Sequence, residues 1–253
     1  MIFNTHSHIN DKYDQIKELL DECMQNDVTK VAVVGYDYSS SLSALKAAKE
    51  FDNVYAICGL QPSGVESFDG NFKPFIELFD NPKCICIGEI GLDYYYGKDT
   101  KELQLKYFEE QLKIACNYKK PIEIHCRDAH EDTYNLLAKY ADKLDGIILH
   151  CYTGSVEMMH RYLKLGAYIS ISGVVTFKNA KTIKEVVSAC PIERLLVETD
   201  DPYLTPVPFR GKENHPSYVK YVVNEIALIK QISFEKASEI TYENAMRVFH
   251  LWK

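Results

Sequence analysis

The segment PIEIHCRDAHEDTYNLLAKYADKLDGIILHCYTGS (residues 121–155) contains two short apolar runs, and each run ends in a histidine. Short continuous apolar runs are typical of strands that are buried on both faces, as in a parallel sheet. Runs of this kind recur along the chain with longer segments between them. They predict eight strands, at residues 2–5, 30–35, 54–59, 84–88, 121–125, 146–150, 167–170 and 195–199.

The segments between the runs have the spacing of amphipathic helices; Leu105, Phe108 and Leu112, for example, fall on one helical face. Parallel strands joined by helices form either a closed barrel or an open, doubly wound sheet. No GxGxxG turn follows the first run, and a length of 253 residues is that of a typical barrel. We therefore predict an α/β protein with a single domain over residues 1–253, a (β/α)₈ TIM barrel with an outer ring of helices.

Local signals place some of the helix ends. Asp99 and Glu102 have the spacing of a capping box, and Ser155 is a predicted N-cap for a helix that Gly166 ends. Residues 202–216 are rich in proline and turn residues, which predicts a long loop over one mouth of the barrel. Two further helices are predicted at residues 218–230 and 234–250.

The composition limits the kinds of partner. The chain has 29 Lys and Arg against 36 Asp and Glu, for a formal net charge of -7. This balance excludes a broad basic surface for wrapping duplex DNA, so contacts with nucleic acid must be local. No stretch has the pattern of a signal peptide or the roughly 20 apolar residues of a membrane span. The eight cysteines are irregularly spaced without a CxxC pair, so we expect reduced thiols, a cytoplasmic protein and no obligate protein partner.

Six polar residues stand at the carboxyl ends of predicted strands. Parallel barrel strands direct these ends toward one mouth, where barrel enzymes have their active sites. Imidazole and carboxylate groups together suit Zn²⁺, Mn²⁺, Ni²⁺ or Fe²⁺, and a carboxylate can bridge two ions. We therefore predict two divalent ions, with Mg²⁺ as a further candidate, bound by His6, His8, Glu89, His125, His150 and Asp200.

Each of these residues alone has a simpler interpretation, because a histidine at a strand end is most often a hydrogen-bonded structural residue. The prediction depends on six such placements at one mouth. Glu123 and Glu198 share the strand faces of His125 and Asp200, so we expect them to orient the metal-binding imidazoles. A buried salt bridge lower in the barrel is the alternative for Glu123. The other histidines are predicted to be structural: His130, His160, His215 and His250.

Longer motifs carry a family resemblance over nearly the whole chain. The most specific are GEIGLDYY (88–95) and ETDDPYLTPVPFRGKEN (198–214), and further matches are THSHIN (5–10), PIEIHCRDAHEDT (121–133), LHCYTGS (149–155), ISISGVVTFKNA (169–180) and SEITYENAMRVF (238–249). With these motifs the chain resembles the TatD family of metal-dependent deoxyribonucleases, within the amidohydrolase-like barrels. The resemblance implies that His6, His8, Glu89 and Asp200 hold one metal, and that Glu89, His125 and His150 hold the other. Two positions depart from the family pattern: Asn4 replaces a frequent aspartate, and Gln61 replaces the usual histidine.

The expected reaction is hydrolysis of phosphodiester bonds in DNA, with RNA as a further substrate, by a 3′–5′ exonuclease acting on single strands or ends. Asp200 is expected to be the general base and Glu89 the second catalytic carboxylate. Substrate contacts are predicted at Arg127, Tyr203, Arg210 and Lys212, because arginine binds phosphate bidentately and tyrosine stacks on bases. A surface ion pair with Asp128 or Glu131 is the alternative for Arg127.

The neighbouring tyrosines Tyr94, Tyr95 and Tyr152 are further candidates for base stacking, with simple loop packing as the alternative. An alternative interpretation is that the protein is a hydrolase of a small amide, lactone or ester, because the same barrel and metal set serve carbonyl chemistry. Glu89 stands where many such relatives carry a carboxylated lysine, which favours the nuclease. The other rival interpretation is a binding protein without catalysis. Such a protein would be expected to lack at least one of the metal-binding residues.

Overall fold

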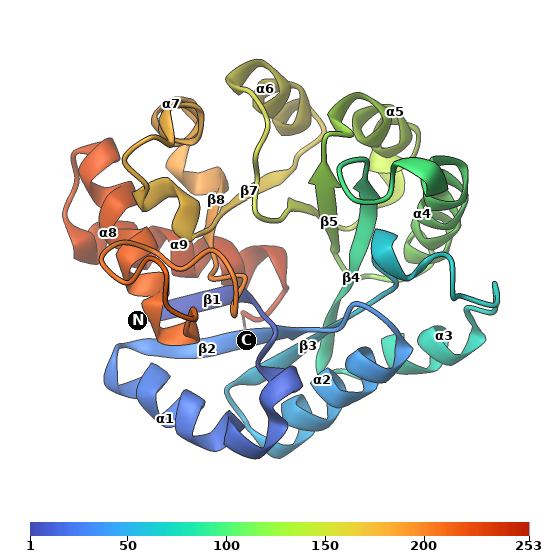
Figure 1. The fold of residues 1–253 in the computed structure, drawn as a ribbon, viewed down its shortest axis with the longest axis horizontal. Helices are drawn as coiled ribbons and strands as arrows, with labels where there is room; N and C mark the ends of the chain where they lie inside the picture. Colours follow the sequence, from blue (N-terminus) through green and yellow to red (C-terminus); the bar gives the residue numbers. More distant parts are fainter. Residues whose placement is uncertain (253) are drawn as a thin grey trace.

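A computed structural model describes residues 1–252, apart from the side chain of Tyr13. In these residues eight parallel strands pair in sequence order and curl into a nearly closed barrel inside a ring of helices (Figure 1). This confirms the predicted (β/α)₈ architecture. The strands are β1 Ile2–Ser7, β2 Val28–Val34, β3 Val54–Cys58, β4 Cys84–Asp93, β5 Ile122–Arg127, β6 Ile147–Leu149, β7 Tyr168–Ile171 and β8 Leu195–Val197. The α-helices are α1 Ile16–Gln25, α2 Tyr38–Glu50, α3 Lys73–Phe79, α4 Lys101–Ala115, α5 His130–Tyr140, α6 Val156–Lys164, α7 Lys181–Ala189, α8 Val219–Lys230 and α9 Phe234–Val248.

One predicted helix start is confirmed and one is wrong. The Ser155 hydroxyl accepts the Met158 N–H at 3.1 Å and caps α6, and Gly166, with a φ of +80°, follows its end. The capping box at Asp99 does not form, because a 3₁₀ turn, η3 Lys98–Thr100, precedes α4. The Gln104 amide holds that turn by donating to the Gly97 carbonyl at 2.8 Å.

The floor of the barrel is apolar. Phe3 at the start of β1 packs against Phe249, with ring centroids 5.5 Å apart, and against Tyr242 of α9. Ile148 and Leu196 belong to the same buried cluster. Helix α9 therefore covers the amino ends of the strands, which leaves the opposite mouth for polar chemistry.

The seam between β8 and β1 is joined largely by a side chain. The Asn4 amide donates to the Thr199 hydroxyl at 2.8 Å, and its carbonyl oxygen accepts the Thr199 N–H at 3.1 Å. One residue further on, the Asp200 N–H donates to the His6 carbonyl at 3.1 Å. These bonds fix His6 and Asp200 next to each other, because both strand ends are held in register at this point.

Two further expectations concern the whole chain. All eight cysteines are free thiols, as expected. Among the described residues, no helix combines the length and the apolar character needed to cross a bilayer. The loop over residues 202–216 and the two helices after it are also found, with α8 following a short 3₁₀ turn at η7 Pro216–Tyr218.

Candidate metal centre

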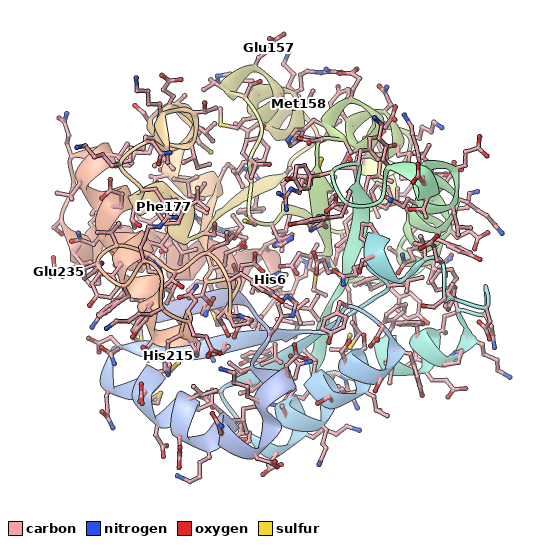
Figure 2. All side chains as sticks on the ribbon, viewed as in Figure 1. His6, Glu157, Met158, Phe177, His215 and Glu235 are labelled. Carbon is pink, nitrogen blue, oxygen red and sulfur yellow. The ribbon has the colours of Figure 1, made fainter. Side chains whose placement is uncertain are left out.

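The predicted metal ligands come together at the carboxyl ends of the strands. His6 lies near the middle of the barrel in Figure 2, whereas Glu157 on α6 and Glu235 on α9 lie at the periphery. A cleft of about 1130 Å³ opens at this mouth. Five of the six predicted ligands line it, namely His8, Glu89, His125, His150 and Asp200, and His6 is fully buried directly beneath them.

The first group consists of His6, His8 and Asp200. The two Nε2 atoms of the histidines lie 3.1 Å apart, and the Asp200 Oδ1 atom is 3.6 Å from that of His6 and 3.7 Å from that of His8. The other ring nitrogen of His8 donates to the Val34 carbonyl at 3.0 Å, since a carbonyl can only accept. The Nε2 lone pair of neutral His8 therefore points into this group.

The second group consists of Glu89, His125 and His150. The Glu89 Oε1 atom is 2.7 Å from Nδ1 of His125 and 3.0 Å from Nε2 of His150. Each ring has a carboxylate behind it, because His125 Nε2 is 3.0 Å from Asp93 and His150 Nδ1 is 3.3 Å from Glu198. Asp93 accepts a hydrogen bond from His125, and Glu198 lies within ion-pair distance of His150. The outer nitrogens of both rings thus face carboxylates, so the inner nitrogens are available as ligands.

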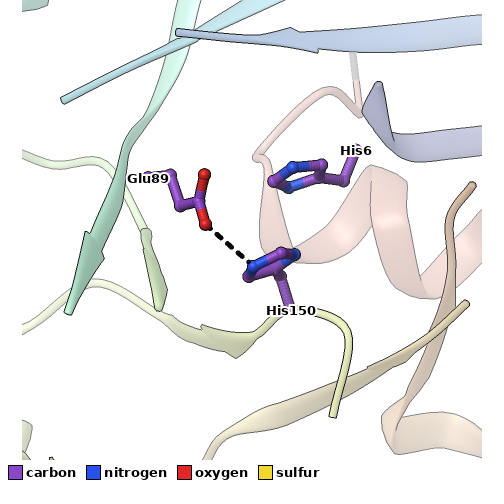
Figure 3. A group of neighbouring side chains, drawn as sticks. All are labelled: His6, Glu89 and His150. Carbon is purple, nitrogen blue, oxygen red and sulfur yellow. Dashed lines mark ion pairs between the residues drawn. The ribbon is translucent and has the colours of Figure 1, made fainter. Parts of the chain in front are cut away.

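His6 connects the two groups. Its ring stacks on that of His150 with centroids 4.1 Å apart, and the Glu89 carboxylate faces both rings (Figure 3). His6, Glu89 and His150 offer ligand atoms within 4.8 Å of one another, and so do His6, His8 and Asp200. Such a convergence of nitrogen and oxygen lone pairs, with few hydrogen-bond donors between them, fits divalent cations.

The protonation of the cluster is set by burial and by the neighbouring charges. Burial lowers the pKa of His125, but Asp93 and Glu89 outweigh it and raise it to about 9. Burial likewise opposes charge on Glu89, yet the adjacent His150 and His125 hold its pKa well below the usual range. Without a cation, protons on these two histidines balance Glu89. Metal binding must displace those protons.

The two inner glutamates each lie beside one histidine, Glu123 beside His6 and Glu198 beside His150. Glu123 Oε2 is 3.0 Å from Nδ1 of His6, and both residues are completely buried. Burial raises the pKa of Glu123 well above its usual value. Glu198 accepts the Cys151 N–H at 2.7 Å and a hydrogen bond from the Ser170 hydroxyl. Glu123 thus contacts a predicted ligand directly, rather than a cation lower in the barrel.

Asp93, the last residue of β4, is a site residue that sequence reasoning missed. One carboxylate oxygen lies 3.0 Å from Nε2 of His125. The other accepts the N–H groups of Tyr95 and Tyr96 at 2.9 and 2.8 Å. Asp93 therefore links the metal centre to the loop that carries these tyrosines. Its position four residues after Glu89 on one strand, with both side chains at the same mouth, was the available signal.

We expect Asp93→Ala to weaken metal binding about 10- to 100-fold, because His125 loses the acceptor that orients its ring. Asp93→Asn is the matched variant: its amide oxygen can still accept the Tyr95 and Tyr96 N–H groups, but its amide group cannot accept from His125 when so oriented. Metal dissociation constants by competition with a chelating dye test this. An Asn variant with the parent affinity would show that the loop contacts, not the imidazole contact, are the function of Asp93.

The predicted substrate residues divide into two sets. Arg127 and Tyr203 line the cleft. The Arg127 guanidinium lies over the rings of Tyr95 and Tyr96, at 4.1 and 4.7 Å from their centroids. Glu131, a predicted alternative partner, pairs instead with Arg161. Arg210 and Lys212 are exposed on the loop after β8 and do not line the cleft; Arg210 packs over Phe177.

Two of the candidate stacking tyrosines have other contacts. Tyr152 is buried, and its hydroxyl donates to the Ser155 carbonyl at 2.8 Å. The Tyr94 hydroxyl donates to Asp132 at 2.8 Å, and Lys101 lies over its ring. Tyr95, by contrast, is 58% exposed and lines the cleft together with Tyr96, a tyrosine not among the predicted stacking residues.

The two departures from the family pattern have distinct surroundings. Asn4 donates to the Thr199 hydroxyl and to the Pro216 carbonyl, at 2.8 and 3.2 Å, and a carboxylate could do neither. Asn4 is therefore suited to the barrel seam. Gln61 lines the cleft, so its neutral amide faces the space in which a substrate would lie.

The remaining histidines lie away from the two groups of predicted ligands. His130 is close to the thiol of Cys126, at 3.2 Å, and His215 accepts the Ser217 N–H at 3.1 Å. His250 pairs with Asp145 at 3.0 Å. These contacts agree with structural roles.

Comparison with known proteins identifies the family. The model of the family described as TatD related DNase matches residues 3–250. The chain is 42% identical to the uncharacterized metal-dependent hydrolase YabD of Bacillus subtilis (strain 168), over 99% of this chain and 100% of that protein. It is 35% identical to the uncharacterized metal-dependent hydrolase YcfH of Escherichia coli (strain K12), over 94% of this chain and 90% of that protein.

Solved structures agree. The crystal structure of YJJV, a TatD homolog from Escherichia coli K12, superposes with a TM-score of 0.93 at 25% identity and covers 98% of each chain. An organophosphorus hydrolase variant has a TM-score of 0.65 at 12% identity, over 98% of this chain and 92% of that one, which shows a shared fold alone.

A parallel eight-stranded barrel with a mixed imidazole and carboxylate cluster at its carboxyl mouth defines a class of metal-dependent barrel enzymes. The chain belongs within this class to the TatD related DNase family, and it is a metal-dependent hydrolase.

Proposed function

We propose that this protein hydrolyses phosphodiester bonds in DNA, as an exonuclease that acts on single strands or strand ends with two divalent ions. The observation that carries the proposal is the pair of ligand groups that meet at His6 and Glu89, directly below a cleft that contains Arg127. Two adjacent divalent ions are suited to phosphoryl transfer, since they lower the pKa of water and stabilise both the attacking and the leaving oxygen.

The residues of this chain have distinct parts in the reaction. His6, His8 and Asp200 would hold one ion, His125 and His150 the other, with Glu89 between them. Asp200 is the general base and accepts the proton of the attacking water on its carboxylate. Burial raises the pKa of Asp200 to about 6, which gives this carboxylate more basicity than an exposed aspartate.

Arg127 binds the phosphate group to be cleaved. Its guanidinium is planar and suits two phosphate oxygens at once. The rings of Tyr95 and Tyr96 support it, so its position does not depend on a neighbouring carboxylate. Tyr203, which is 67% exposed at the same mouth, offers a face for an unpaired base.

The proposal is tested with a single-stranded oligonucleotide that is labelled at either end. Activity should disappear in excess chelator and return when Mn²⁺, Mg²⁺, Zn²⁺ or Ni²⁺ is added. A 3′–5′ exonuclease releases a 3′ label at once as mononucleotide and shortens a 5′-labelled strand stepwise. A lactone and a cyclic amide serve as comparison substrates. Turnover of either of them, with no product from the oligonucleotide under any metal, would refute the nuclease.

A further inference from the structure

The lining of the cleft is strongly acidic. Six carboxylates face it: Glu66, Glu89, Asp93, Asp99, Asp128 and Asp200. Three of them, Glu89, Asp93 and Asp200, belong to the metal centre. The other three, Glu66, Asp99 and Asp128, are exposed on three separate loops and form no ion pair with any described residue. We call these three residues the acidic rim.

Arg127 is the one lysine or arginine among the described residues that line this cleft. Two neighbouring cations are engaged elsewhere, and Lys98, next to Asp99, is exposed but does not line the cleft. Lys101 pairs with Asp132 at 2.8 Å, and Arg210 packs on Phe177 outside the cleft. A substrate in the cleft therefore meets one guanidinium, and beyond it the negative charges of the rim.

This charge pattern differs from that of proteins that follow a nucleic-acid backbone. Such proteins line a groove with several cations, and each phosphate contact releases counterions and makes binding depend on salt. Here a second or third phosphate would come close to Glu66, Asp99 or Asp128. Bound divalent ions offset the charge of the metal centre, but they leave the rim acidic.

Aromatic rings provide the remaining contact surface of the cleft. Tyr96 and Tyr203 are 75% and 67% exposed there, on the loops after β4 and β8. Both offer faces on which a base can stack without regard to its identity. The cleft thus combines one phosphate contact with stacking surfaces on two loops.

From this pattern we propose that the cleft recognises a substrate of dinucleotide size. One phosphodiester group lies at Arg127, the bases on either side stack on exposed tyrosines, and the acidic rim excludes further phosphates. The inference rests on the proposed nuclease function and narrows its substrate class to short oligonucleotides and the last residues of a strand. In a longer strand, the nucleotides beyond this dinucleotide contribute no further binding energy.

The test compares deoxyribo-oligonucleotides of 2, 3, 6 and 20 nucleotides in kcat/KM per strand end, and in the affinity of phosphorothioate analogues. We expect values that agree within about threefold from the dinucleotide upward. Between 50 and 200 mM salt, one phosphate contact predicts a decrease of about threefold, whereas four contacts predict about fiftyfold. A tenfold or greater rise with length, or the steep salt dependence, would overturn the inference.

Charge-reversal variants make the test specific. Glu66→Lys and Asp99→Lys should introduce a dependence on length and salt, because they place cations where a second phosphate would pass. Glu185→Lys on the outside of α7 makes the same change of charge away from the cleft and should behave as the parent. Arg127→Gln should lower kcat/KM equally for all lengths.

The outcomes separate the two proposals. If neither the dinucleotide nor any longer strand is cleaved, the nuclease function fails and this inference falls with it. If all lengths are cleaved but longer strands bind more tightly, this inference alone fails. In that case Arg210→Gln and Lys212→Gln would show whether the exposed loop after β8 binds the additional phosphates.

Discussion

Replacing Glu89 with alanine is expected to lower kcat/KM by about a thousandfold or more. Glu89 stands between His125 and His150, so its loss removes a ligand that both ions are proposed to share. Stabilisation of the transition state by a metal amounts to several kcal/mol, and each 1.4 kcal/mol corresponds to a factor of ten in rate. Elemental analysis of the purified variant should find less than the parent amount of metal.

The same substitution has a second expected effect, on the metal-free protein. The two histidines next to Glu89 would lose the negative charge that balances their protons. Breaking a buried pair of this kind lowers the free energy of unfolding by about 3–5 kcal/mol. Thermal unfolding in chelator measures it, with Glu157→Ala on the surface of α6 as the control. An active, metal-replete Glu89→Ala protein would remove the basis of the proposed centre.

Asp200→Asn is expected to reduce kcat by about 10²- to 10⁴-fold with little change in KM, because an amide cannot accept the proton of water. The pH profile distinguishes this role from a purely structural one. A base must be unprotonated to act, and burial raises the pKa of Asp200 to about 6, while bound cations lower it. Parent activity should therefore rise with pH along a limb at or below about pH 6, and this limb should be absent in the variant.

The metal content of Asp200→Asn must be measured alongside its rate, because Asp200 is also a proposed ligand. A fall in kcat at saturating metal supports the general base. If added metal restores the parent rate, Asp200 acts only as a metal ligand. If rate and pH profile both stay unchanged, the proton is accepted by another group.

The barrel and the convergence of its polar residues at one mouth could be predicted, because both follow from the pattern of apolar runs in the sequence. Strands buried on two faces are largely apolar, so runs such as the one that becomes β3 stand out in the sequence. Parallel pairing then directs the carboxyl end of every strand to one mouth. His125 and His150 follow from this rule, since His125 lies two residues before the end of β5 and His150 directly follows β6.

Other parts of the centre depend on geometry that no residue pattern encodes. Strict alternation would place Phe3 and His6 on opposite faces of β1, yet both face the barrel interior. A register shift between Asn4 and Ser7 accounts for this, and a similar shift between Ile87 and Ile90 surrounds Glu89. Irregularities of this type re-aim side chains next to active sites.

Loop residues were the hardest to place, because a loop can carry a charge toward a site or away from it. Arg127 and Arg210 looked equivalent in the sequence, but only Arg127 extends a strand and lines the cleft. Asp99 looked like a helix cap and lies on the acidic rim instead. The spacing of Asp93 from Glu89 places both on one face of β4, but the partner of Asp93, His125, comes from the next strand and is set by the pairing of β4 with β5.

The contact between Phe3 and Phe249 bears on how the protein is made. Because Phe3 of β1 packs against Phe249 just after α9, the apolar floor of the barrel is uncovered until α9 has been synthesised. Nascent chains that lack α9 are therefore expected to expose apolar surface and to depend on chaperones. Expression of a version that stops before α9 should yield aggregated polypeptide rather than a weakened enzyme.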